Sequence, residues 1–221
     1  MNGYMKPQDI EKRSFEIITA ELGERTFPAG IAEVVKRVIH TTADFDYAKS
    51  LRFTPGAVQK AVEALHKGTF LVTDTNMALA GITKPGLAKL GGQAACYMAD
   101  PEVAARAKAG GTTRAVAAMH KAAAEHPGAI LAVGNAPTAL LTIAEQIEAG
   151  LRPALVIGVP VGFVNVVESK ERLFVTCEAH GVPAIVAMGR KGGSNVAAAI
   201  CNALIYSAAE MLDPTARGWN G

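Results

Sequence analysis

The stretch Ile130-Leu131-Ala132-Val133-Gly134-Asn135-Ala136-Pro137-Thr138-Ala139-Leu140 decides the fold class of this sequence. Its first four residues are apolar and form a run of the length expected for a fully buried strand. Gly134 then opens a loop, and a run with helical spacing follows from Thr138 to Glu148. A buried strand, a loop and a helix in succession predict one unit of an α/β fold.

The same alternation recurs along most of the chain. The predicted strands are Phe70–Thr73, Ala94–Met98, Ile130–Val133, Ala154–Ile157 and Ala184–Ala187. The predicted helices between and after them are Pro101–Lys108, Thr113–Glu125, Thr138–Glu148, Val166–Ala179 and Ser194–Leu212. Because the strands are almost entirely apolar, we expect an open parallel sheet of about five strands with helices on both faces.

Helical runs also precede this alternating part. The residues Pro7–Leu22 predict a helix with Ile10, Ile17 and Ile18 inward, and Pro28 opens a second helix. A third begins at Pro55-Gly56 and continues through Leu65. No linker interrupts the apolar pattern, so we expect a single domain over 1–221, with a helical segment to about 68, a sheet portion over about 69–212 and a loosely held tail from 213.

The composition limits the classes of function. Half of the 221 residues are hydrophobic, 19% are charged and the net charge is +2, which argues against a general nucleic-acid binder. Cys96, Cys177 and Cys201 are too scattered for a disulfide framework or a zinc site. The polar start predicts no signal peptide, and the apolar stretch Leu155–Val164 is too short to span a bilayer. We expect a soluble cytoplasmic protein without a metal site.

The segment from Arg37 to Asp46 contains a candidate catalytic group. Four apolar residues recur at helical spacing before it and predict a buried stripe: Ile31, Val34, Val35 and Val38. His40 falls opposite that stripe at the helix end, where the helix dipole favours a protonated imidazole. Thr41 and the polar residues after it offer hydrogen bonds. The alternative is a surface histidine that caps the last carbonyls.

Two further residues occupy unusual positions. Ser14 lies on the same helix face as Ile10 and Ile18, where a hydroxyl either bonds the carbonyl four residues earlier or faces a polar cleft. Arg114 stands in the first turn of its predicted helix, where the dipole disfavours a cation. A bound carboxylate would remove that objection, although an arginine that extends into water would also do so.

The loops after the predicted strands are candidate ligand sites, because ligands of parallel sheets bind at the carboxyl ends of strands. The loop Gly189–Ser194 carries Arg190 and Lys191 at a helix start and suits an anion, or else it is a solvated turn. It lacks the spacing of a nucleotide phosphate loop, and no dinucleotide fingerprint occurs. Asp74 and Asn135 lie in two other such loops.

Several motifs in order resemble one family across nearly the whole chain. They are Ile10-Glu11-x-x-Ser14-Phe15, Arg37-x-Ile39-His40-Thr41-Thr42-x-Asp44, Asp74-Thr75-Asn76-Met77, Thr113-Arg114, Gly134–Leu140, Gly158–Val164 with Glu168-Ser169-Lys170, and Gly189–Ser194. Taken together, this set is similar to precorrin-8X methylmutase, also called cobalt-precorrin-8 methylmutase, of cobalamin (vitamin B12) biosynthesis.

The resemblance implies a fold and an activity. The fold would be flavodoxin-like and the protein a homodimer with its active site near the subunit interface. The activity would be an isomerisation that moves a methyl group from C11 to C12 of precorrin-8, giving hydrogenobyrinate, or cobyrinate from the cobalt form, with no cofactor consumed. Leu51-Arg52-Phe53 and Asp74-Thr75-Asn76-Met77 are closer to the cobalt-dependent branch.

The resemblance also implies roles for residues. His40 matches the catalytic histidine, and Ser14 and Arg114 match positions that contact the substrate. We expect Arg190 and Lys191 to hold substrate carboxylates, and Thr41, Asp74 and Asn135 to complete the substrate site. Two other functions remain as alternatives. One is a corrinoid carrier without turnover, and the other is a flavodoxin-like enzyme that binds a nucleotide or phosphate.

Overall fold

The computed structural model describes residues 5–28 and 30–217. Its strands are β1 (Leu51–Phe53), β2 (Leu71–Thr73), β3 (Ala94–Cys96), β4 (Ile130–Val133), β5 (Leu155–Gly158) and β6 (Ala184–Ala187). Its α-helices are α1 (Pro7–Leu22), α2 (Ile31–Thr42), α3 (Tyr47–Ser50), α4 (Ala57–His66), α5 (Asn76–Gly81), α6 (Lys84–Lys89), α7 (Pro101–Ala109), α8 (Arg114–Glu125), α9 (Pro137–Glu148), α10 (Val166–Ala179) and α11 (Ser194–Ala208). The structure also contains two short 3-10 helices, η1 (Tyr97–Ala99) after β3 and η2 (Pro214–Arg217) after α11.

The strands form one sheet in the order β1-β6-β5-β4-β2-β3. All neighbours are parallel except β1, which pairs antiparallel with β6. The five parallel strands taken alone have the flavodoxin-like order, so the predicted fold class is confirmed. The antiparallel edge strand β1 was not predicted, because three residues of mixed polarity carry no recognisable period.

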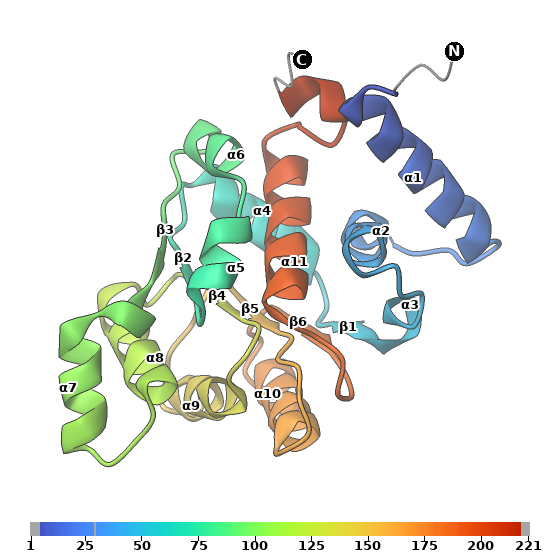
Figure 1. Ribbon diagram of the computed structural model, residues 1–221. Helices are drawn as coiled ribbons and strands as arrows, with labels where there is room; N and C mark the ends of the chain where they lie inside the picture. The colour runs from blue at the N-terminus through green and yellow to red at the C-terminus, as the bar shows by residue number, and fades with distance from the viewer. Residues whose placement is uncertain (1–4, 29, 218–221) are drawn as a thin grey trace.

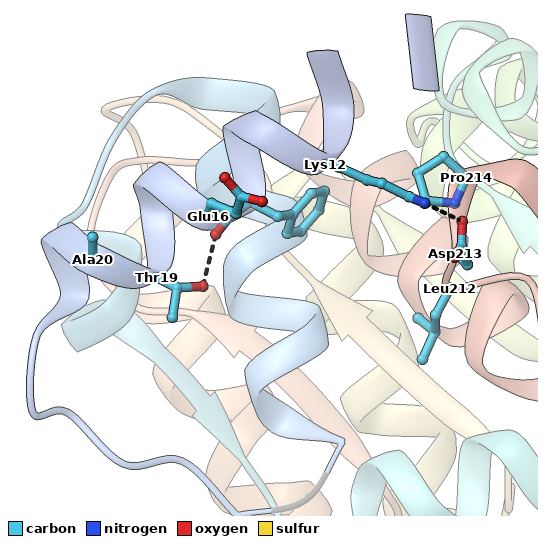
Figure 2. A pocket seen from close by; sticks show the side chains of 8 residues that line it. Lys12, Glu16, Thr19, Ala20, Leu212, Asp213 and Pro214 are labelled. Atoms are coloured by element: carbon cyan, nitrogen blue, oxygen red, sulfur yellow. Dashed lines mark hydrogen bonds and ion pairs between the residues drawn. The ribbon is translucent and has the colours of Figure 1, made fainter. Parts of the chain in front are cut away.

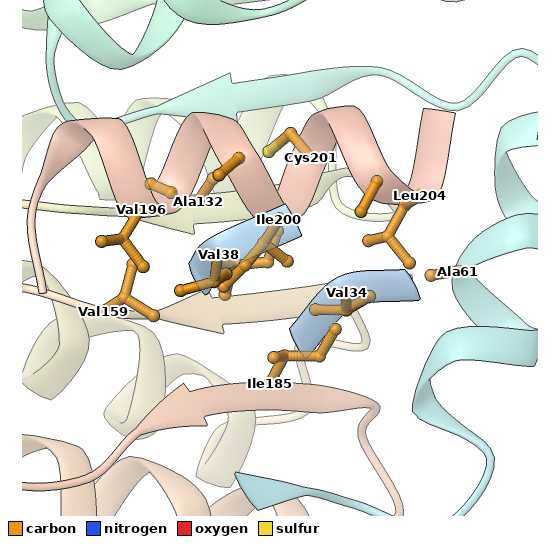
Figure 3. Packing of buried hydrophobic residues seen from close by; sticks show 14 of the residues in the cluster. Val34, Val38, Ala61, Ala132, Val159, Ile185, Val196, Ile200, Cys201 and Leu204 are labelled. Carbon is orange, nitrogen blue, oxygen red and sulfur yellow. The ribbon is translucent and has the colours of Figure 1, made fainter. Parts of the chain in front are cut away.

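Two apolar layers cover the sheet. One contains α2, α4 and α11 against alternate residues of the strands, and the other contains α8, α9 and α10 against the intervening residues. Figure 3 shows Val34 and Val38 of α2 packed beside Ile200 of α11, above Ile185 of β6. The helix α1 lies farther out, on α2, and does not cover the sheet (Figure 1).

The N-terminal helix corrects one prediction. Ile18 is buried, but Ile10 and Ile17 are 52% and 44% exposed, so the expected inward face of α1 is wrong at those two residues. The reason is that α1 packs mainly on α2 and on the short C-terminal turn, which together cannot bury a wide apolar stripe. Two exposed isoleucines therefore remain on a helix that also carries Ser14.

The short helices α3, α5 and α6 were not predicted, since fewer than two turns give no clear period. The last long helix ends at Ala208 rather than at Leu212. The tail was expected to be loosely held, but up to Arg217 it is ordered. Pro214–Arg217 forms a 3-10 helix, and the Arg217 side chain is only 4% exposed. Its remaining residues, 218–221, lie outside the described part of the chain.

The loops at the carboxyl ends of the strands pack closely because of glycine. A Cβ atom on Gly192 would lie 2.1 Å from the carbonyl oxygen of Val159, and one on Gly134 would lie 2.8 Å from the Cα of Ser194. Gly193 N–H also donates to the Val159 carbonyl at 2.8 Å. The loops after β4, β5 and β6 therefore form one continuous surface.

Candidate active site

His40 lies in the last turn of α2, on the side away from the sheet. Val34, Val35 and Val38 are buried as predicted, whereas the His40 side chain is exposed. The helix ends two residues later at Thr42, and its C-cap Ala43 has a left-handed φ of 53°. Thr41 and Thr42 still belong to the last turn of the helix, where Thr42 Oγ1 donates to the Val38 carbonyl at 2.8 Å.

The imidazole of His40 contacts α1. Its ring stacks on Phe15, with 5.2 Å between centroids and 20° between planes. Next to this pair is a cavity of about 270 Å³ lined by Ser14, Ile17, Ile18, Glu21, Ile39, His40, Ala43 and Phe45. The structure thus brings the two predicted residues Ser14 and His40 to one cavity.

Both alternatives for Ser14 hold at once. Its Oγ donates to the Ile10 carbonyl at 2.8 Å, and the same side chain lines the cavity. A hydroxyl oxygen that donates in this way keeps its lone pairs as acceptors. Thr41 is exposed in the same helix turn as His40, but it is not among the residues that line the cavity.

The surroundings of His40 act on its pKa in the direction opposite to the helix dipole. Partial burial lowers its pKa below the ordinary 6.5, and the positive charge of Arg37 lowers it further. Glu11 acts in the opposite direction with a smaller effect, and Arg217 adds to the lowering. The net effect of burial and of these charges lowers the pKa of His40 and so favours the neutral imidazole.

Lys191 connects the loop after β6 to the end of α2. Its Nζ lies 2.6 Å from Asp44 Oδ2 and 2.6 Å from Asp46 Oδ2. Lys191 therefore lies close to the end of the helix that carries His40, but its ammonium group already has two carboxylate partners. Its neighbour Arg190 is exposed and lies over the Phe163 ring at 5.5 Å. No carboxylate of the described residues pairs with Arg190, which leaves its guanidinium available.

Lys170 supports that loop from beneath. Its side chain is fully buried, and its Nζ donates to the carbonyls of Gly189 and Lys191 at 2.8 and 2.9 Å. Burial lowers its pKa to about 8. Sequence analysis assigned it no role, although it shares the buried stripe of α10 with Leu173 and Cys177 at helical spacing.

Asp74 organises the loop after β4. Its side chain is 1% exposed, and its carboxylate accepts the main-chain N–H groups of Gly134, Asn135 and Ala136, each at 2.8 Å. Both carboxylate oxygens are thus engaged inside the protein, which speaks against the predicted direct contact with substrate. The Asn135 side chain itself is exposed at the same edge, so it keeps its predicted position.

Arg114 is not brought to His40 within one chain. It begins α8, with Thr113 as N-cap, and its side chain is exposed. The helices α8 and α2 belong to opposite apolar layers of the sheet. Figure 1 shows them on opposite sides of the strands. Arg114 accordingly does not line the cavity that His40 and Ser14 share.

A wider groove lies on the other flank of α1. It has a volume of about 700 Å³ and lies between α1 and the segment from Leu212 to Pro214. Figure 2 shows Lys12 of α1 reaching Asp213 across one end of it, with 3.3 Å between Nζ and Oδ1. None of the predicted site residues lines this groove.

The described part of the chain also excludes some arrangements. Within residues 5–28 and 30–217, no three histidine, cysteine, aspartate or glutamate side chains gather as a metal site would require. No helix in the same ranges is both long and apolar enough to cross a bilayer.

Known proteins match this chain over most of its length. A profile of the precorrin-8X methylmutase family matches residues 9–207. The chain belongs to the precorrin-8X methylmutase family. It is therefore an enzyme, and its class is that of the methylmutases, which are isomerases.

Individual relatives agree with the family match. The cobalt-precorrin-8 methylmutase of Priestia megaterium is 45% identical over 90% of this chain and 88% of its own length. That of Salmonella typhimurium is 45% identical over 93% of this chain and 98% of its own length. The crystal structure of precorrin-8X methylmutase from Thermus thermophilus superposes with a TM-score of 0.82 and 44% identity, covering 91% of this chain and 98% of that one.

Proposed function

We propose that this methylmutase moves a methyl group from C11 to C12 of cobalt-precorrin-8 or precorrin-8, giving cobyrinate or hydrogenobyrinate in cobalamin biosynthesis. The family supports the reaction class, and two relatives at 45% identity are named for the cobalt form. The observation that carries the site assignment is the cavity shared by His40 and Ser14.

The reaction sets modest demands on the protein. The C11–methyl bond breaks as the C12–methyl bond forms, so the shift is intramolecular and needs no nucleophile from the enzyme. It gains from holding the macrocycle in one orientation and from stabilising the charge that develops. Any cobalt ion belongs to the substrate. The many carboxylates of such a macrocycle suit the available guanidinium of Arg190 and that of Arg114.

In this proposal His40 donates a proton or a hydrogen bond to the ring C nitrogen and so favours the rearranged conjugation. General acid catalysis of this kind contributes about 10²–10⁴-fold. Because the pKa of His40 lies below 6.5 in the free protein, the ring is mostly neutral before binding. The negative charge of a bound polycarboxylate raises that pKa, so His40 takes up its proton together with the substrate.

The proposal includes a homodimer whose sites combine two chains. His40 and Arg114 lie on helices of opposite sheet layers, which supports a site that takes one residue from each of two chains. A two-fold axis that apposes the α2 side of one copy to the α8 side of the other would unite them. Exposed apolar side chains near the carboxyl edge, including Met77, Phe163 and Val164, are available for burial in such an interface.

The first test is an anaerobic absorption time course with precorrin-8 in its cobalt and metal-free forms. The enzyme should convert one form with a change in the visible spectrum, and His40→Ala should lose about 10²-fold or more of that rate. His120→Ala, an exposed histidine on α8, is the matched control and should keep it. Turnover by His40→Ala near the wild-type rate would refute the role of His40 as the general acid. A saturable spectral shift without conversion would instead identify a carrier.

The second test is complementation between inactive subunits. His40→Ala and Arg114→Ala chains are mixed, unfolded and refolded together. If each site takes His40 from one chain and Arg114 from the other, the mixture should recover about a quarter of wild-type activity, because half of the dimers then contain one intact site. No recovery in a mixture that forms dimers would place both residues in one chain or exclude Arg114 from the site.

A further inference from the structure

A buried glutamate on α1 holds together elements from both ends of the chain. Glu11 is 7% exposed, and Arg37 of α2 donates to its Oε1 at 2.6 Å. Arg217 of η2 donates to both of its carboxylate oxygens, at 2.8 and 2.7 Å. The Arg217 side chain also donates to the carbonyls of Met211 and Leu212. One carboxylate thus fixes α1 to α2 and to the C-terminal turn.

The same cluster reaches His40 through aromatic rings. The guanidinium of Arg37 lies 4.6 Å from the centroid of Phe15, and Phe15 stacks on the His40 imidazole. On the other side, Arg217 lies 3.9 Å from the centroid of Tyr206 on α11. Arg37 is thus held by Glu11 on one side while it covers the ring on which His40 rests.

The position of α1 depends strongly on the ion pairs of Glu11. Only Ile18 and Leu22 among its apolar side chains are buried, while Ile10 and Ile17 are exposed. An apolar stripe usually fixes a helix on a domain, and α1 has only a short one. Buried ion pairs add little net stability compared with apolar packing, but they define geometry when every partner is bonded.

We propose that Glu11, Arg37 and Arg217 are positioning residues that clamp α1 on α2, so that Phe15 and Ser14 take fixed places around His40, and that the clamp's charges set the electrostatic field at the imidazole. This rests on the proposed function in one respect, namely that His40 is the acid. The C-terminal turn at Arg217 is then part of the active-site architecture, although it does not line the His40 cavity.

The charged groups on the elements around His40 come from five segments. They are Glu11 and Glu21 on α1, Arg37 on α2, Asp44 after the end of α2, Lys191 in the loop after β6, and Arg217 on η2. Among the clamp residues, Arg37 and Arg217 lower the pKa of His40 and Glu11 raises it. Removing Glu11 or Arg217 therefore changes that pKa in opposite directions, although both changes damage the same clamp.

The test compares Glu11→Gln and Arg217→Met with a matched control. Lys12→Ala removes the exposed ion pair with Asp213, which joins the same two segments outside the clamp. The pKa of His40 is measured by NMR titration of its ring nitrogens in the ligand-free protein. It should fall in Glu11→Gln, rise in Arg217→Met and stay unchanged in Lys12→Ala. In both clamp variants kcat should fall about tenfold or more, since small displacements of catalytic groups are costly, while KM changes less.

The outcomes separate the two proposals. The clamp would be overturned if the His40 pKa shifted in the same direction in both clamp variants or did not shift. It would also be overturned if kcat stayed unchanged in a folded clamp variant, or if Lys12→Ala lost as much kcat as the clamp variants. Arg217→Lys replaces the methionine variant if that one does not fold, and it should retain the His40 pKa but lose part of kcat because an ammonium cannot make the same fork. The NMR result needs no turnover, so an active His40→Ala would refute the acid and leave the clamp standing.

Discussion

Lys191 Nζ lies 2.6 Å from Asp44 Oδ2, and this contact joins the loop after β6 to the end of the helix that carries His40. The two residues are 147 positions apart in the sequence. The contact places the loop that carries Arg190 and Lys191 next to this helix end. It also gives the Lys191 ammonium a carboxylate partner, whereas Arg190 has none among the described residues. The roles of Arg190 and Lys191 can therefore be separated by experiment.

Arg190 is expected to contribute more to substrate binding than Lys191. Arg190→Met should raise KM about tenfold, the effect of losing one charge-assisted hydrogen bond to a carboxylate. Lys191→Met should raise it less, because the Lys191 ammonium already pairs with Asp44 and Asp46. Steady-state kinetics at two ionic strengths would measure both variants. A larger KM effect in Lys191→Met than in Arg190→Met would reverse the assignment.

Asp74 is expected to act on stability and not on substrate contact. Asp74→Asn replaces one acceptor oxygen by an amide donor, which leaves at least one buried N–H of the Gly134–Ala136 loop unpaired. The free energy of unfolding should fall by about 2 kcal/mol. Urea denaturation measures it, with the exposed Asp9→Asn as control. An unchanged midpoint together with a large rise in KM would support the direct substrate contact instead.

The lowered pKa of Lys170 should be detectable in the pH dependence of stability in alkaline solution. Its ordinary pKa of 10.5 is lowered to about 8 in the folded protein. Between these values the unfolded chain carries more protons on this group than the folded chain, so its contribution makes the free energy of unfolding rise as the pH increases. This rise should be absent in Lys170→Met and present in Lys60→Met, whose lysine is exposed.

At neutral pH the same Lys170→Met variant should lose little stability, because a buried charge is removed along with its two carbonyl bonds. Its KM should rise, since the Gly189–Lys191 loop loses its internal support. Urea titrations from pH 7 to about 10.5 and steady-state kinetics would test both parts. A variant with the wild-type pH dependence would show that Lys170 titrates in its ordinary range.

Gly192 should not tolerate any side chain. A Cβ atom there would lie 2.1 Å from the Val159 carbonyl, and both groups are backbone that cannot move independently. Gly192→Ala should cost on the order of 3 kcal/mol or prevent the loops from packing. Gly128→Ala is the control, because nothing lies within 4 Å of its Cβ position. Thermal unfolding of both variants measures the difference, and equal melting temperatures would contradict the close packing.

The sequence by itself determined the alternation of strands and helices, and hence the five parallel strands. Apolar runs such as Ile130–Val133 are local signals, since a strand buried on both faces must be apolar along its length. The stripe of Val34, Val35 and Val38 likewise placed His40 on the outer side of α2. The ordered motifs were enough to predict the family, which the comparisons confirm.

Only the tertiary structure decided which groups meet. Asp74 binds N–H groups about 60 residues away, and Glu11 binds Arg217 across 206 positions, distances over which no periodicity carries information. The expected inward face of α1 was wrong at Ile10 and Ile17 because burial depends on neighbours, not on pattern alone. The pKa of His40 shows the same limit. The helix dipole is local and visible in the sequence, whereas the burial and the charge of Arg37 that lower this pKa arise from packing.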